Sequence, residues 1–155
     1  MARRPERKYA LDSNLFIAAF RRPRANEALQ RFHRGFAPFE YLSTVVEHEL
    51  RAGARASQAQ RLLEAHIFRP FHRRGRTFTP SHAAWAEAGD LLAALHREEG
   101  LDVKRARGAF RNDILLALSC REAGIVLVTD NARDFARIRQ HVRFTFVPPW
   151  PAPTE

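Results

Sequence analysis

The clearest pattern of apolar and polar positions lies between residues 110 and 135. From Asn112 to Ala123, apolar residues go most of the way round a helix, which is typical of a helix buried on several sides, and Gly124 ends it. The next residues, 125–129, read IVLVT, a short uninterrupted run that predicts a fully buried strand of a parallel sheet.

Acidic residues stand at the ends of this helix and strand. A helix and the strand that follows it run antiparallel in an α/β sheet, so the first turn of the helix lies beside the carboxyl end of the strand. We therefore expect Asp113 and Asp130 at one edge of the sheet, with Asp134 one helical turn farther on. Ligands of open parallel sheets bind at this edge.

Similar patterns recur earlier in the chain. Residues 8–11 predict a strand that ends at Asp12, with Ser13 as the cap of the next helix. Residues 40–43 predict a second strand, and residues 44–47, TVVE, form a capping box with the threonine as N-cap. Asp12 is thus a further acidic residue at the carboxyl end of a strand.

Later segments complete the order of elements. Residues 77–79 form a weak strand, a helix with Trp85 in its apolar stripe ends at Gly100, and residues 142–147 form a last strand. This order predicts the α/β class, as a three-layer α/β/α sandwich with a central, mainly parallel sheet of four to five strands. An all-helical fold would have to discard the segments IVLVT and FTFV.

The composition adds a strong positive charge. The 155 residues contain 26 Lys and Arg against 17 Asp and Glu, a formal charge of +9, and 24 of the basic residues are arginine. Arginine matches phosphate oxygens, so an acidic polymer is one explanation, and arginine usage in a GC-rich genome is an equally weighted one.

Other features bound the organisation. The single cysteine, Cys120, excludes a disulfide framework and a cysteine metal site. The sequence contains no run of eighteen apolar residues that could span a membrane, so we expect a soluble, cytoplasmic protein. We expect one domain over residues 8–147, preceded by a basic arm at 1–7 and followed by a proline-rich tail at 148–155.

Carboxylates are the candidate chemistry. Asp12, Glu49, Asp113 and Asp134, with Asp130 as a fifth, all fall at strand ends or in adjoining helical turns. Each alone has a structural explanation, as a helix cap, a favourable charge at a helix N-terminus or a partner of arginine.

If these carboxylates lie close together, their mutual repulsion must be offset by something. Two like charges about 4 Å apart repel by about 4 kcal/mol at an effective dielectric of 20, so several such pairs would approach the stability of a whole domain. Protonation, neighbouring arginines or a divalent cation would offset this repulsion, and Mg²⁺ or Mn²⁺ suits hard oxygen ligands best. Such a site on a basic protein suggests hydrolysis of a phosphodiester.

Four segments carry a resemblance to a known family: LDSNLFI (11–17), STVVEHELRAG (43–53), RNDILLALSCREAG (111–124) and LVTDNARDF (127–135). In this order they resemble the PIN-domain ribonucleases, and most closely the virulence-associated protein C (VapC) toxins of type II toxin–antitoxin pairs. The resemblance covers about the first and last thirds of the chain.

Roles follow from the resemblance. It implies Asp12 and Asp113 as the main metal ligands and Glu49 and Asp134 as further catalytic acids. The polar residues that it implies as support for the cluster are Ser13, Asn14 and Thr129. Asp130 occupies a position that is often not acidic in the family, where an extra ligand and a turn residue are both open and the turn is favoured.

Activity and partners are implied as well. The resemblance implies Mg²⁺-dependent endonucleolytic cleavage of RNA, with Mn²⁺ as a substitute, a homodimer, a cognate antitoxin whose tail fills the active-site groove, and the strand order 3-2-1-4-5. We further expect arginines of basic segments to hold RNA phosphates, namely Arg73, Arg74, Arg105, Arg107 and Arg111.

Two other functions remain open at this stage. The arginine content also fits a non-catalytic RNA-binding or partner-binding module of the same fold. A small-molecule phosphotransferase is disfavoured because Asp12 is followed by Ser-Asn, with no second aspartate two positions on.

Overall fold

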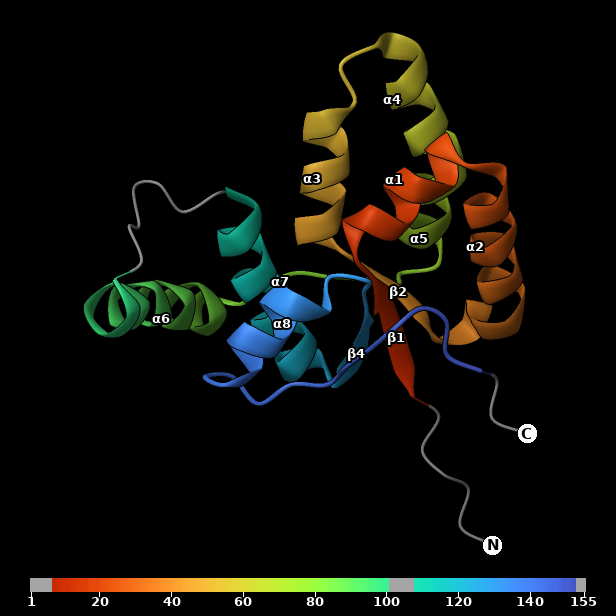
Figure 1. The fold of residues 1–155 in the computed structure, drawn as a ribbon. Coiled ribbons are helices and arrows are strands. Elements are labelled where there is room, and N and C mark those ends of the chain that lie inside the picture. Colours follow the sequence, from red (N-terminus) through yellow and green to blue (C-terminus); the bar gives the residue numbers. More distant parts are fainter. Residues whose placement is uncertain (1–6, 101–107, 153–155) are drawn as a thin grey trace, which may run out of the picture.

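A five-stranded parallel sheet forms the centre of the protein in the computed structural model, which describes residues 7–100 and 108–152 (Figure 1). The strands are β1 (Lys8–Leu11), β2 (Glu40–Ser43), β3 (Thr77–Phe78), β4 (Ile125–Val128) and β5 (Phe146–Val147). Their order is β3-β2-β1-β4-β5, and every neighbouring pair is parallel. The predicted parallel sheet and the order 3-2-1-4-5 are therefore confirmed.

Helices cover the sheet on two sides. The first group comprises α1 (Ser13–Arg21), α2 (Pro23–Phe36), the 3-10 turn η1 (Ala37–Phe39), α3 (Thr44–Gly53), α4 (Ser57–Leu63), the π-helical turn η2 (Glu64–Phe68) and α5 (Arg69–Arg73). The second group comprises α6 (His82–Glu99), α7 (Gly108–Ala123) and α8 (Ala132–Arg139). Figure 1 shows the two groups on opposite sides of the strands, so the α/β sandwich is confirmed. None of the helices in the described ranges is long and apolar enough to cross a membrane.

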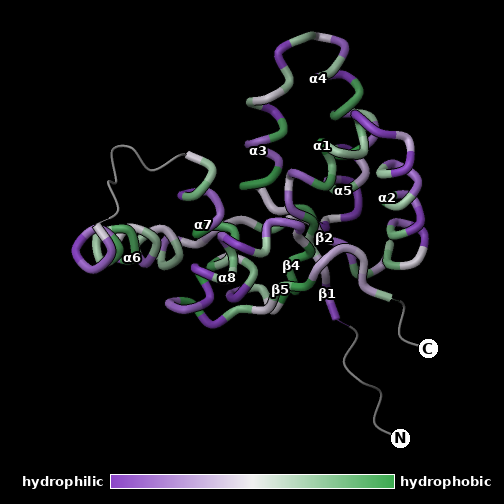
Figure 2. The backbone as a smooth tube through the Cα atoms, in the orientation of Figure 1, coloured by the Kyte–Doolittle hydropathy of each residue, from purple (hydrophilic) through white to green (hydrophobic). Residues whose placement is uncertain are grey.

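Helix α7 and strand β4 form the most deeply buried pair of elements. All four residues of β4 are buried, and so is every residue of α7 from Asp113 to Cys120. Such all-round burial explains why the apolar residues of this helix show no single stripe. Figure 2 shows the apolar colour gathered around β4 and β5 and hydrophilic residues along the outer turns of α2, α6 and α8.

The start of α3 differs from its prediction. Ser43 caps this helix, because its Oγ accepts a hydrogen bond from the Val45 N–H at 3.1 Å, so the assignment of Thr44 as N-cap is wrong. The Glu47 carboxylate is paired with Arg51 at 2.7 Å and with His72 at 3.0 Å. A capping box would need the Glu47 carboxylate to accept a hydrogen bond from the N-cap backbone N–H. Here the carboxylate is paired with Arg51, one helical turn on, and with His72 of α5.

Three further details of the pattern differ as well. Helix α7 begins at Gly108, which places Asp113 in its second turn and not its first. Only Phe146 and Val147 of the predicted 142–147 strand pair with β4, although Val142 and Phe144 are buried as expected. The expectation that Trp85 lies in the core is wrong, since this side chain is 59% exposed on α6.

Candidate active site

The order in which strands are added to the sheet reverses at β1. From β1 the chain builds β2 and β3 on one side and then returns to add β4 and β5 on the other. Asp12 directly follows β1, and Thr129 directly follows β4, its neighbour in the sheet. This edge is a topological switch point, the place where open parallel sheets bind ligands.

Asp12 is held rigidly at this point. Its carboxylate is 2% exposed; Oδ1 accepts a hydrogen bond from the Ser13 N–H at 2.8 Å, and Oδ2 accepts one from the Thr129 hydroxyl at 2.7 Å. Asp12 is therefore the N-cap of α1, and the expectation that Ser13 fills this role is wrong. Burial raises the pKa of Asp12 even though these two hydrogen bonds favour the ionised form.

Asp113 comes from α7 and faces the same place. It is 7% exposed. Burial first, and then the charges of Asp12, Glu49 and Asp134, raise its pKa from 3.8 to about 8. Because the charges of Asp12, Glu49 and Asp134 all act on Asp113, the structure places these three predicted carboxylates near it.

Glu49 approaches from the second turn of α3. Burial and the charge of Asp12 raise its pKa, while hydrogen bonds from the side chains of Asn112 and Ser13 act in the opposite direction. Its Oε1 is buried and has no hydrogen-bond partner among the described residues. An unpartnered buried carboxylate oxygen is an acceptor that a ligand or a water could satisfy.

Asn131 is a residue that the sequence analysis missed. Its side-chain amide donates to Asp134 Oδ2 at 3.1 Å and to Asp113 Oδ2 at 3.5 Å, and its backbone N–H donates to the Thr129 hydroxyl at 3.0 Å. Through Thr129 this residue is also connected to Asp12. The signal was its place between two acidic residues, Asp130 and Asp134, which suggested only the start of a helix.

Other predicted residues are exposed or lie outside the described part of the chain. Asn14 and Asp130 are exposed, and the charge of Asp130 is only a minor contribution to the raised pKa of Asp12. Arg111 is exposed in the first turn of α7, close in sequence to Asp113. Arg105 and Arg107 lie outside the described residues.

Arg73 and Arg74 lie at the edge of the sheet opposite the one where the groove is expected. Arg73 is the last residue of α5 and Arg74 follows it, and both precede β3, so they lie at the amino ends of the strands, whereas the carboxylates lie at the carboxyl ends. Arg74 lines a cavity there together with Glu40, the first residue of β2. The structure thus does not bring these two arginines to the acidic cluster.

The donor set suits a hard divalent cation. As the side chains stand, no three His, Cys, Asp or Glu residues in the described part of the chain form a ready ligand group. Mg²⁺ does not require one, because it commonly binds one or two carboxylates and keeps several waters. Asp12 and Asp113, whose pKa values are both raised, and the unpartnered Oε1 of Glu49 fit such an ion.

Known proteins share both the sequence pattern and the fold. Residues 9–140 match the PIN domain family. Ribonuclease VapC2 of Haemophilus influenzae is 31% identical over 133 residues, which span 84% of this chain and 92% of that relative.

Solved structures agree on the fold. FitAcB from Neisseria gonorrhoeae superposes with a TM-score of 0.65 at 20% identity, covering 93% of this chain and 99% of that one. DNA-bound VapBC from Salmonella typhimurium gives 0.62 at 24% identity, covering 92% and 98%. Because the family match spans most of the sheet and all four clustered carboxylates, and a VapC relative aligns along most of its length, this chain belongs to the PIN-domain family, in its VapC group.

Proposed function

We propose that this protein is a metal-dependent endoribonuclease, the toxin of a type II toxin–antitoxin pair, which hydrolyses RNA phosphodiester bonds at the carboxyl edge of its sheet. The observation that carries the proposal is that Asp12, Glu49 and Asp134 all act on the buried Asp113, whose pKa is raised to about 8 by burial first and then by these three charges. A protein that needed this edge only for stability would not concentrate buried carboxylates there. The VapC relative named a ribonuclease supports the same reaction.

Asp12 and Asp113 would hold the ion, which we propose to be Mg²⁺ with Mn²⁺ as a substitute. When bound, a divalent cation polarises a phosphoryl oxygen, lowers the pKa of a bound water and stabilises the charge on the leaving oxygen. The side chains around it have separate tasks. Thr129 fixes Asp12 through its 2.7 Å hydrogen bond, and Asn131 spaces Asp113 from Asp134.

Glu49 is the residue that we assign to the attacking water. Its Oε1 is unpartnered and buried, and its pKa is raised, so it can accept a hydrogen bond from water and is a stronger base than an ordinary glutamate. The neighbouring Ser13 and Asn112 side chains orient the carboxylate. Arg111, exposed in the first turn of α7, is placed to hold a phosphate of the RNA on the way to this site.

The test is cleavage of an end-labelled RNA by purified protein. We expect products with Mg²⁺ or Mn²⁺, none with EDTA, and a loss of at least a hundredfold for Asp12→Asn and for Asp113→Asn. The matched control is Asp90→Asn, a change of the same chemistry on the exposed surface of α6, which should leave the rate unchanged. Full activity in both site variants would reject the assignment.

A second function remains in contention because of the formal charge of +9. A non-catalytic RNA-binding module of the same fold would bind RNA tightly and with a steep salt dependence but would release no products. Metal-dependent cleavage that depends on Asp113 eliminates this alternative.

Partners follow from the relatives. The similar structures from Salmonella typhimurium and Rickettsia felis are VapBC assemblies, and we propose that this chain likewise binds an antitoxin protein and forms a homodimer. Sedimentation of the purified chain tests the dimer. Co-expression with the protein of the adjacent reading frame tests the antitoxin, which should copurify with the chain and suppress its cleavage activity.

A further inference from the structure

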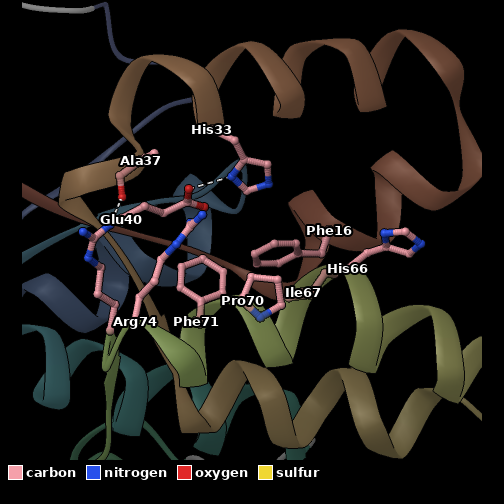
Figure 3. Close-up of a pocket in the computed structure, with 10 residues that line it drawn as sticks. Phe16, His33, Ala37, Glu40, His66, Ile67, Pro70, Phe71 and Arg74 are labelled. Carbon is pink, nitrogen blue, oxygen red and sulfur yellow. Dashed lines mark hydrogen bonds and ion pairs between the residues drawn. The ribbon is translucent and has the colours of Figure 1, made fainter.

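A second polar site lies at the opposite edge of the sheet from the carboxylate cluster. Figure 3 shows this cavity, which has a volume of about 140 Å³. It opens beside the first residue of β2, between α1, α2 and the turns around α5. The residues that matter for its chemistry are Phe16, His33, Glu40, Phe71, Arg74 and Arg76.

Glu40 is the polar group that needs a partner in this cavity. The residue is 3% exposed, and its Oε2 is paired with the Nδ1 of His33 at 2.6 Å. The other oxygen, Oε1, is buried and has no hydrogen-bond partner in the part of the chain that the structure describes. A buried acceptor left unpaired costs about 1–3 kcal/mol, and more when it is charged, so an occupant with an N–H or O–H would be favoured.

The walls of the cavity suit a flat ring. Phe16 and Phe71 line the cavity together with Ile67 and Pro70. Figure 3 shows both aromatic rings near Pro70. A cavity of about 150 Å³ lined by apolar side chains holds benzene, whereas one water occupies about 30 Å³. The space therefore fits a single six-membered ring and is too small for a purine.

Arginines supply the opposite charge at the rim. Arg76 donates to the Ala37 carbonyl oxygen and is thereby held in place. Arg74 is exposed, and its guanidinium makes no ion pair with any residue in the described ranges, so it is available for an anion. A guanidinium binds phosphate oxygens through two parallel hydrogen bonds.

We propose that this cavity binds a single cytosine nucleotide, with the exocyclic amine on Glu40 Oε1, the ring against Phe16 and Phe71, and the phosphate on Arg74. Cytosine presents an N–H₂ donor that a carboxylate accepts. Uracil presents its one N–H between two carbonyl oxygens, which would face the acceptors of Glu40. The nucleotide is either free or an unpaired residue of an RNA chain, and its binding needs no metal.

Calorimetric titration of the full chain in EDTA tests this site separately from RNA cleavage. We expect CMP to bind at least tenfold more tightly than UMP, and N4,N4-dimethyl-CMP, which lacks the amine hydrogens, to bind no better than UMP. Arg74→Gln should weaken CMP at least fivefold. Arg73→Gln, a neighbouring exposed arginine outside the cavity lining, is the matched control and should leave CMP binding unchanged.

Short RNAs separate the two sources of the nucleotide. The oligomers AACAA and AAUAA are titrated in the same buffer. CMP binding with the expected preference supports a free nucleotide, and a cytosine preference seen only in the oligomers supports an RNA residue. Equal binding of cytosine and uracil ligands, no binding of either, or CMP binding that survives Arg74→Gln undiminished would overturn the proposal.

Discussion

Replacing Asp113 by Asn should stabilise the metal-free protein while abolishing its cleavage activity. The Asp113 carboxyl is 7% exposed and lies among the charges of Asp12, Glu49 and Asp134, which together with burial raise its pKa from 3.8 to about 8. Keeping an ionised carboxylate there opposes folding, and asparagine has nearly the same shape without the charge.

The magnitude follows from the pKa. At about 1.36 kcal/mol per pH unit, moving a pKa from 3.8 to about 8 corresponds to at most about 6 kcal/mol. Rearrangement of side chains and entry of water reduce such values, so we expect Asp113→Asn to gain about 2–3 kcal/mol at pH 8.

The sign of the pH dependence is defined. Between the unfolded pKa near 3.8 and the folded pKa near 8, the folded protein binds more protons than the unfolded chain, so its stability falls as the pH rises through this window. The advantage of Asp113→Asn over the natural protein should therefore be absent near pH 4, grow towards pH 8 and then level off.

Urea unfolding in EDTA, followed by circular dichroism at pH 4 to 9, measures this difference. Asp90→Asn on the exposed surface of α6 is the control and should follow the natural protein at every pH. Adding Mg²⁺ at a hundred times its dissociation constant should raise the stability of the natural protein by about 2.7 kcal/mol and leave Asp113→Asn unchanged. A difference that does not vary with pH, or a loss of stability at pH 8, would refute the reasoning.

Three further substitutions test the scaffold by urea unfolding. Thr129→Val leaves the buried Asp12 Oδ2 without its donor and should cost about 1–3 kcal/mol of unfolding free energy. Thr129→Ser keeps the hydroxyl and should cost less, and equal losses in the two variants would contradict the role of that hydrogen bond. Gly124→Ala should cost about 1–2 kcal/mol because its φ is +66°. Gly53→Ala, which has the same free space around it and no positive φ, should instead stabilise by about 0.4–1 kcal/mol, and matching effects would show that backbone conformation is not the cause. Leu116→Ala should cost about 2–5 kcal/mol because Leu116 is fully buried, whereas the exposed Leu62→Ala should change little, and a small effect at Leu116 would mean that the core closes around the lost atoms.

Strand β4 shows what the pattern of residues can predict. Four consecutive apolar residues, all of them buried, define both the element and its central place in a parallel sheet. Strand β5 shows the limit. The run 142–147 has the alternation of a longer strand, but a strand extends only as far as a neighbour accompanies it. Phe146 and Val147 pair with β4, and among the described residues of the run before them only the Thr145 carbonyl accepts a hydrogen bond from β4, from the Leu127 N–H.

The burial of Trp85 was mispredicted and the role of Asn131 was missed for a similar reason. Trp85 recurs at the same helical spacing as buried leucines, and whether that face meets another helix depends on how α6 packs on α7. Asn131 has no side-chain capping bond, and its amide instead spans two carboxylates from α7 and α8. Local sequence could propose the cap but could not show those neighbours.

The sequence by itself determined the class of fold, the identity of the buried elements and the acidic residues at the carboxyl ends of strands, because burial and secondary structure follow from residue spacing. Only the tertiary structure decided which side chains meet. Thr129 and Asp12 are 117 positions apart and bond at 2.7 Å because β4 pairs with β1, whereas Arg73 and Arg74, equally basic in the sequence, are carried to the opposite edge because their loop precedes a parallel strand. Which strands lie beside one another, and whether their carboxyl ends meet at one edge, are set by the crossover connections of the whole chain.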